Sequence, residues 1–147
     1  MVRKTDAEYD EMSWHDSFIH GFSMDQTDLR SDLVIDIDHI VDWRCEEERT
    51  EFLISPASLT FHDVTDLRLV IDWGESGYIK SVFGMYIIDI YREMVETKMR
   101  FERYYRWIIE LNDSNSSIAM GASGYTHFQR KEPIWVDRQG LTKDQRA

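Results

Sequence analysis

The alternation of apolar and polar side chains over residues 33–43 restricts the fold of this chain more than any other feature. The stretch LVIDIDHIVDW places Leu33, Ile35, Ile37, His39, Val41 and Trp43 on one side of an extended strand, and Val34, Asp36, Asp38, Ile40 and Asp42 on the other. A period of two predicts a β-strand whose apolar face packs into a core. The opposite face then carries an outward row of three carboxylates, Asp36, Asp38 and Asp42.

Similar patterns recur at short spacing along most of the chain. Strands are predicted at about 17–24, 33–43, 51–55, 57–61, 67–73, 81–95, 99–111 and 118–129. Polar turns join them, and the small residues at 121–124 predict a bend in the last strand. The pattern predicts an all-β or β-rich α+β fold, an antiparallel sandwich or partly closed barrel of about seven to eight strands.

Two of the predicted connections are hairpins. Residues 57–61 and 67–73 form one around a turn at 63–66, with Pro56 before it at a strand edge or corner. Residues 81–111 form the other, a long hairpin with its turn at 96–98. A helix over about 92–106, supported by good helix formers, stays open as the alternative.

The chain is expected to hold a polar lead-in (1–13), a single β-rich domain (14–136) and a polar tail (137–147). The first residues contain no apolar segment, so we expect no signal peptide and a cytoplasmic location. The only cysteine, Cys45, excludes an internal disulfide.

The charge is strongly negative. Seventeen basic against 28 acidic side chains give a formal net charge of −11 and a pI near 4.8. Such a surface repels nucleic acids and anionic membranes and attracts basic proteins. We therefore expect a basic protein partner, with a homodimer as a further option.

The pattern of possible catalytic or metal-binding residues is weak. Asp36 and Asp38 would point the same way, about 7 Å apart, so a metal-dependent or small-ligand-binding domain built on these carboxylates is the alternative function. The five histidines have no zinc spacing and no nucleophile motif is present, so no catalytic, metal or cofactor residue is assigned and a non-enzymatic role is favoured.

Among the apolar positions, His39 is expected to be a hydrogen-bonded core residue. The aromatic residues Trp43, Trp73, Phe101, Tyr105 and Trp107 fall on predicted inner faces. The predicted partner-binding residues are the acidic Asp36, Asp38, Asp42, Glu46, Glu47 and Glu48, together with Trp135, which lies outside the clear strands.

Several stretches resemble a group of uncharacterised small bacterial domains: WHDSFI, LVIDIDHIVDW, SPASLTFHDVTDL, GASGYTHFQR and DRQGLT. In size, acidity and the rhythm of LTFHDV, the chain is also similar to the immunity proteins of bacterial polymorphic toxin systems. That likeness implies a domain that neutralises a toxin by binding it.

Overall fold

A computed structural model describes residues 2–74, 84–96 and 101–147 of the chain. Its elements are β1 (Arg3–Thr5), the 3-10 helix η1 (Asp6–Glu11), β2 (Ser17–Thr27), β3 (Arg30–Glu46), β4 (Arg49–His62), β5 (Thr65–Val70), β6 (Tyr86–Met94), β7 (Tyr105–Leu111), β8 (Ser117–Ala122), β9 (Gly124–Gln129), β10 (Ile134–Val136) and the helix α2 (Lys143–Arg146). Within these ranges, no helix is long and apolar enough to cross a membrane.

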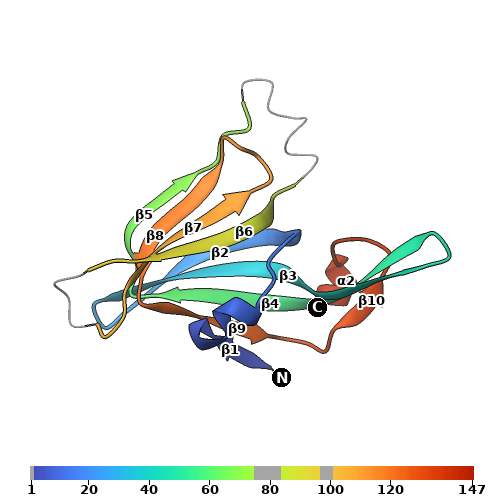
Figure 1. Cartoon of the computed structure of the whole chain (residues 1–147), viewed down its shortest axis with the longest axis horizontal. Coiled ribbons are helices and arrows are strands. Elements are labelled where there is room, and N and C mark those ends of the chain that lie inside the picture. The colour runs from blue at the N-terminus through green and yellow to red at the C-terminus, as the bar shows by residue number, and fades with distance from the viewer. Residues whose placement is uncertain (1, 75–83, 97–100) are drawn as a thin grey trace.

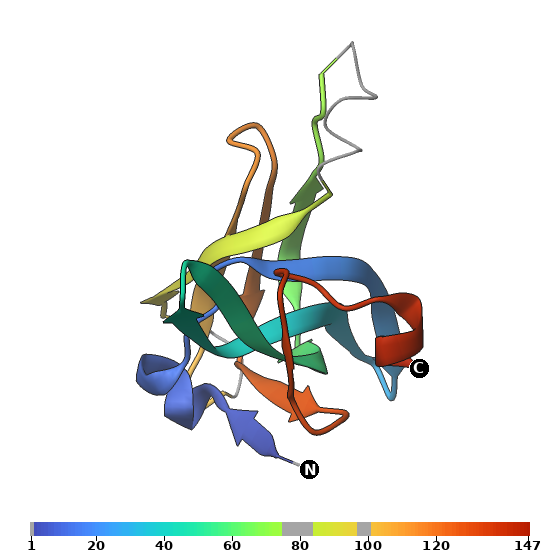
Figure 2. The same cartoon turned by 90° about the vertical axis from the view of Figure 1, so that its right-hand side faces the viewer.

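The predicted antiparallel β fold is confirmed. The strands form one ten-stranded sheet in the order β1-β9-β4-β3-β2-β6-β7-β8-β5, with β10 paired to β4, and the sheet is not closed into a barrel. Figures 1 and 2 show the sheet curving strongly, so that one face is concave. The described residues form ten strands where about eight were expected, because they include the short β1 and β10 and because residues 117–129 form two strands, whereas the predicted strands 51–55 and 57–61 are one continuous strand, β4.

The main core lies on the concave face of the sheet, where apolar side chains of seven strands meet. Strand β7 shows the pattern most clearly, since its residues alternate between buried and exposed from Tyr105 to Leu111. Trp107 is fully buried and packs edge-on against Phe61 and Tyr125. The alternation therefore predicted the inner face of this strand correctly.

The long hairpin is confirmed where it is described. Strands β6 and β7 pair antiparallel from Ile87 opposite Leu111 to Met94 opposite Tyr105, so residues 92–94 and 105–106 are strand rather than helix. The predicted ends at 81–83 and most of the turn at 96–98 lie outside the described residues. Of the predicted inner aromatics, Tyr105 and Trp107 are buried, and Trp73 and Phe101 are half-buried.

The predicted hairpin at 57–73 is wrong. Strand β4 pairs with β9 and strand β5 pairs with β8, so the chain bends at residues 63–64 instead of folding back on itself. Asp63 takes a left-handed conformation (φ 55°), and its carboxylate accepts hydrogen bonds from Arg30 and Ser123. The neighbouring strands β8 and β9 of the same chain bend at this corner too. Between them, the Ser123 amide donates to the His62 carbonyl oxygen (3.0 Å).

Pro56 lies in the middle of strand β4, opposite Asp38 of β3, which corrects its predicted position at a strand edge or corner. The strand tolerates a proline because, within the described ranges, its other edge is unpaired at this residue. On that edge of β4, β10 pairs with residues 52–54 and β9 with residues 57–62, so Pro56 falls in the gap between them. Its missing N–H therefore interrupts no ladder, and its carbonyl oxygen accepts a hydrogen bond from the Arg130 amide (2.9 Å).

Both ends of the chain join the sheet. β1 pairs with β9, and Tyr9 of η1 packs against the core. At the other end, Leu141 joins a second apolar cluster with Ile54 and Val136. Figure 2 shows the C-terminal segment running beside β2 and β3 to α2.

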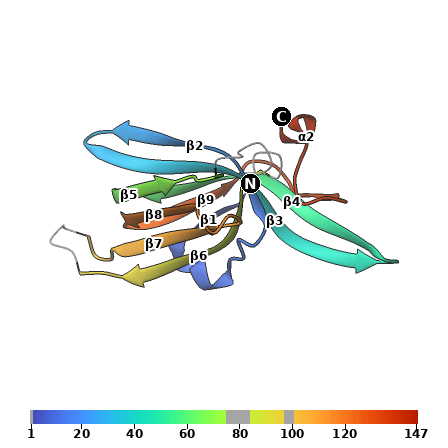
Figure 3. The same ribbon diagram turned by 90° about the horizontal axis from the view of Figure 1, so that it is seen from above.

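The hairpin of β3 and β4 extends beyond the rest of the sheet. We call residues 41–52 the arm; Figures 1 and 3 show it projecting at one end of the molecule. β2 pairs with β3 only as far as Asp38, and β10 pairs with β4 only over residues 52–54. Among the described residues, 44–46 and 49–51 therefore pair only with each other.

Candidate protein-binding surface

The structure divides the predicted partner-binding residues into two groups. Asp36 and Asp38 lie in the middle of β3, beneath the C-terminal segment. Asp42 and Glu46 to Glu48 lie on the arm, and Trp135 of β10 lies at its base. The two groups differ in their surroundings and in what they can bind.

Asp38 does not face solvent, because its side chain is completely buried (0% exposed). It accepts hydrogen bonds from His20 Nε2 (2.7 Å) and the Leu141 amide (2.9 Å), and it forms an ion pair with Arg146. The sequence pattern placed Asp38 on the outward face correctly, but the C-terminal segment covers that face.

Arginines also hold Asp36. Its carboxylate forms an ion pair with Arg130 and another with Arg146 Nη2 (2.6 Å). Burial, followed by the charge of Arg146, lowers the pKa of His20, whose Nε2 donates to the Asp38 carboxylate. The two carboxylates are thus neutralised by two guanidinium groups of the same chain.

The alternative function, a metal or ligand site at Asp36 and Asp38, gains no support from this geometry. Both carboxylates already have arginine partners. Within the described ranges, no group of three or more His, Cys, Asp or Glu side chains could hold a metal ion.

The arm carries an uncompensated negative charge. Five carboxylates, from Asp42, Glu46, Glu47, Glu48 and Glu51, stand against the guanidinium groups of Arg44 and Arg49, which gives a net charge of −3. A hollow of about 800 Å³ at its tip is lined by Glu46, Glu47, Arg49 and Glu51. Asp42 and Glu46 to Glu48 are all exposed, so their charge acts directly on the solvent around the arm.

The turn of the arm consists of two glutamates in left-handed conformations. Glu47 has φ 48° and Glu48 has φ 64°. Two-residue turns of this kind prefer Asn-Gly, because most other residues have a higher backbone energy at positive φ. The structure therefore keeps two charged side chains where an uncharged pair would be more stable.

Trp43 is exposed, which corrects its predicted inner position. A β-bulge is the reason: Ile40 pairs with Ile54 and Asp42 with Leu53, so Val41 is an extra residue in β3. One extra residue moves every following side chain to the opposite face. Trp43 consequently lies on the face of Ile40, opposite Phe52, and is 64% exposed.

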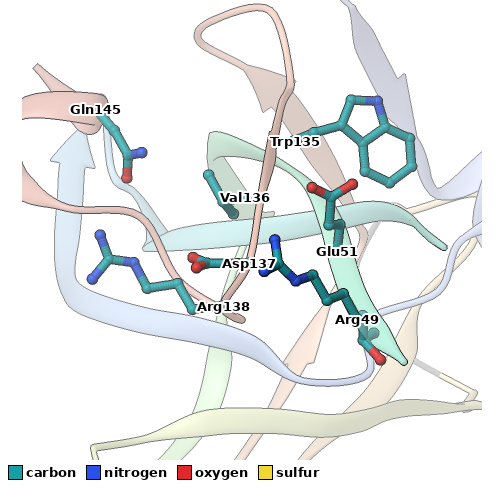
Figure 4. Close-up of a pocket in the computed structure, with 8 residues that line it drawn as sticks. Arg49, Glu51, Trp135, Val136, Asp137, Arg138 and Gln145 are labelled. Atoms are coloured by element: carbon teal, nitrogen blue, oxygen red, sulfur yellow. The ribbon is translucent and has the colours of Figure 1, made fainter. Parts of the chain in front are cut away.

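Trp135 is 37% exposed, and one face of its ring is covered. The Arg44 guanidinium lies 4.1 Å from the ring centroid and is held by Glu51 (2.7 Å). Figure 4 shows Trp135, Glu51 and Arg49 around a pocket of about 740 Å³ between the arm and the C-terminal segment. Trp135 thus lies between the base of the arm and the C-terminal segment.

His39 is a hydrogen-bonded core residue, as predicted. It is buried, and its Nε2 donates to the Ser13 carbonyl oxygen (2.9 Å). The sequence did not indicate its neighbour His127, whose ring centroid lies 4.7 Å away, or the Trp14 ring that packs against both. Burial, and then the neighbouring His39, lower the pKa of His127 to about 3.

A chain of polar contacts crosses three strands on the other face of β4. Thr126 Oγ1 donates to His62 Nε2 (2.8 Å), and His62 Nδ1 donates to Asp32 (3.0 Å). The same Asp32 carboxylate accepts from the Asp63 amide at the corner between β4 and β5. The order resembles a catalytic triad, but the pockets beside the arm and the C-terminal segment do not include these residues. We therefore interpret the contacts as a brace for the corner.

The sequence reasoning missed the basic residues that cover the carboxylates of β3. Arg130 and Arg146 lie far from Asp36 and Asp38 along the chain, although the basic residues Arg138, Lys143 and Arg146 in the polar tail were an available signal. Comparisons with protein-family models, curated proteins and solved structures found no match for the chain.

Proposed function

We propose that the chain is a non-enzymatic interaction domain that binds a basic protein partner through the arm. The observation that carries this proposal is the combination on the arm of a 64% exposed tryptophan, Trp43, with exposed carboxylates. Large aromatic residues dominate binding energy at protein interfaces, and surrounding charges steer the partner and select for it.

The net charge of −11 supports a basic partner, because it attracts positive surfaces over long distances. The Glu47-Glu48 turn supports the same surface, since it adds two exposed carboxylates at the tip of the arm. Asp36 and Asp38 are not part of this surface, because they bind Arg130 and Arg146. The most specific form of the proposal is an immunity protein that neutralises a basic toxin.

The test is affinity capture from host extract with the full chain as bait. Wild type should retain a basic protein, and Glu46→Lys/Glu47→Lys should lose it. The matched control is Asp25→Lys/Asp28→Lys, which changes the net charge equally at the hairpin between β2 and β3 and also substitutes one residue of positive φ. This control should retain the partner.

Capture should weaken as salt rises from 50 to 300 mM, because screening shortens the reach of the charges. If the retained protein is a toxin, co-expression of wild type, but not of the arm variant, should restore growth. Retention of the same protein by the arm variant, or a retained partner without excess positive charge, would contradict the proposal.

A further inference from the structure

A second hollow lies at the base of the arm and shares no described lining residue with the pocket of Figure 4. It measures about 440 Å³ and is lined by Ser13, His15, Asp16, Ile40, Val41, Asp42, Trp43 and Phe52. One wall is the segment that precedes β2, and the other is the open edge of β3 beyond Asp38. We call it the Trp43 pocket.

The lining of the Trp43 pocket combines apolar surface with negative charge. Trp43 and Phe52 supply two aromatic rings, Ile40 and Val41 add aliphatic surface, and Asp16 and Asp42 add carboxylates. No lysine or arginine of the described ranges lines it. A long cationic side chain fits this chemistry, because its methylene stem covers apolar surface while its charged end meets the aromatic faces and the carboxylates.

The arm already contains one arginine that stacks on a tryptophan and pairs with a carboxylate. Arg44 lies over the Trp135 ring at 4.1 Å and is held by the Glu51 carboxylate at 2.7 Å.

The Trp43 pocket has the tryptophan and the exposed Asp42 carboxylate, and the only basic residue in its described lining is His15, which lies 3.4 Å from the Asp16 carboxylate. Asp16 also accepts a hydrogen bond from Gln139 (3.0 Å), so Asp42 is the carboxylate that remains for an incoming cation. A planar guanidinium stacks on an indole ring and pairs with a carboxylate better than an ammonium group does.

We propose that the Trp43 pocket takes an arginine side chain of the basic partner. This inference rests on the proposed function and deepens it, because it names the residue that the partner inserts. The acidic tip of the arm then supplies long-range attraction, and the Trp43 pocket distinguishes arginine from lysine.

The test compares two probes of equal charge, acetyl-(Gly-Arg)₄-amide and acetyl-(Gly-Lys)₄-amide, by calorimetry at 50 mM salt. Wild type should bind the arginine peptide about three- to tenfold more tightly, the range expected for one guanidinium–indole contact. Trp43→Ala should bring both peptides to the same affinity, and Trp43→Phe should keep part of the preference. Asp42→Asn should weaken both peptides and reduce the preference.

The control is Tyr91→Ala, which removes an exposed aromatic side chain of β6 and should keep the full preference. Trp43 is mostly exposed, so its replacement leaves the core intact, and a cooperative unfolding transition in urea checks that the variant is folded. Equal affinities in wild type, a preference that survives Trp43→Ala, or no binding of either peptide would overturn the inference. Affinity capture with the Glu46/Glu47 variant tests the proposed function separately, so its outcome is independent of these results.

Discussion

His127 is an unusual core residue because neither of its ring nitrogens has a hydrogen-bond partner in the described part of the chain. It is 3% exposed and packs against His39 and Trp14. Lys4, directly opposite on β1, also disfavours a second positive charge at this place. His127 is therefore held in its neutral form.

This burial predicts a loss of stability in acid. The folded-state pKa of His127, about 3, lies below its ordinary value of 6.5, so protons bind the unfolded chain more tightly. The contribution of His127 is constant above about pH 6.5 and is lost as the pH falls from there toward 3. Unfolding in urea should show His127→Leu gaining about 2 kcal/mol over wild type at pH 5 compared with pH 7.5.

The control is His15→Gln, since the His15 side chain is 65% exposed and stays in water in the folded chain. The stability of this variant should follow the pH dependence of wild type. If His127→Leu and wild type lose stability in parallel between pH 7.5 and 5, His127 is not the source of the acid sensitivity.

Among the elements, the two hairpin turns at the ends of β3 present a matched pair. Asp28-Leu29 joins β2 to β3 and Glu47-Glu48 joins β3 to β4, and all four residues have positive φ. Leu29 is fully exposed, and Asp28, Glu47 and Glu48 are exposed as well, so side-chain packing does not offset the backbone strain at either turn. Both turns should be improved by residues that accept this conformation.

Replacing Glu47-Glu48 by Asn-Gly should therefore stabilise the domain by about 1 kcal/mol. For a chain of this size that corresponds to a rise in Tm of about 2–4 °C, which calorimetry can measure. The same replacement should weaken binding of the partner, because it removes two carboxylates from the arm.

Asn-Gly in place of Asp28-Leu29 separates these two effects. It should raise Tm similarly and leave partner binding unchanged. If the replacement of Glu47-Glu48 also left partner binding unchanged, these two glutamates would have no role in recognition.

At the scale of the whole molecule, the C-terminal segment closes over the centre of β3. Arg146 is 13% exposed and Asp38 is completely buried, so their ion pair lies largely out of water. Removing one partner of a buried pair leaves the other charge without compensation, which costs more than the pair itself contributes. The docked segment is therefore part of the folded unit.

Arg146→Met should destabilise the domain by about 3 kcal/mol in chemical denaturation. Adding Asp38→Asn should recover at least about 1 kcal/mol of this loss, since the amide carries no charge to bury. Arg130→Met is the comparison: its partner Asp36 is partly exposed, so the cost should stay below about 1 kcal/mol. Equal losses from the two arginines, or no recovery in the double variant, would show that the Arg146–Asp38 pair does not hold the segment.

Prediction from sequence was most successful where the alternation of apolar and polar residues within a single strand decides which side chains face inward. Residues 33–39 and 105–111 follow the predicted alternation, and the members predicted to face inward are buried. It failed where a neighbour changes the pattern: the bulge at Val41 turned Trp43 outward, and the bend at Asp63 sent β5 to β8 instead of β4. Of the candidate surface, the sequence indicated the acidic arm but not the Trp43 pocket, whose walls are separated by more than twenty residues.

By itself, the sequence determined the antiparallel β class, the position of most strands and the negative charge. These depend on local periodicity and on composition, which every short segment carries within itself. Only the tertiary structure decided which carboxylates are available. Asp38 and Asp42 look alike in the sequence, but Arg146, more than one hundred residues away, covers the first and leaves the second exposed on the arm. Burial depends on which distant segments come together, and no local pattern encodes that.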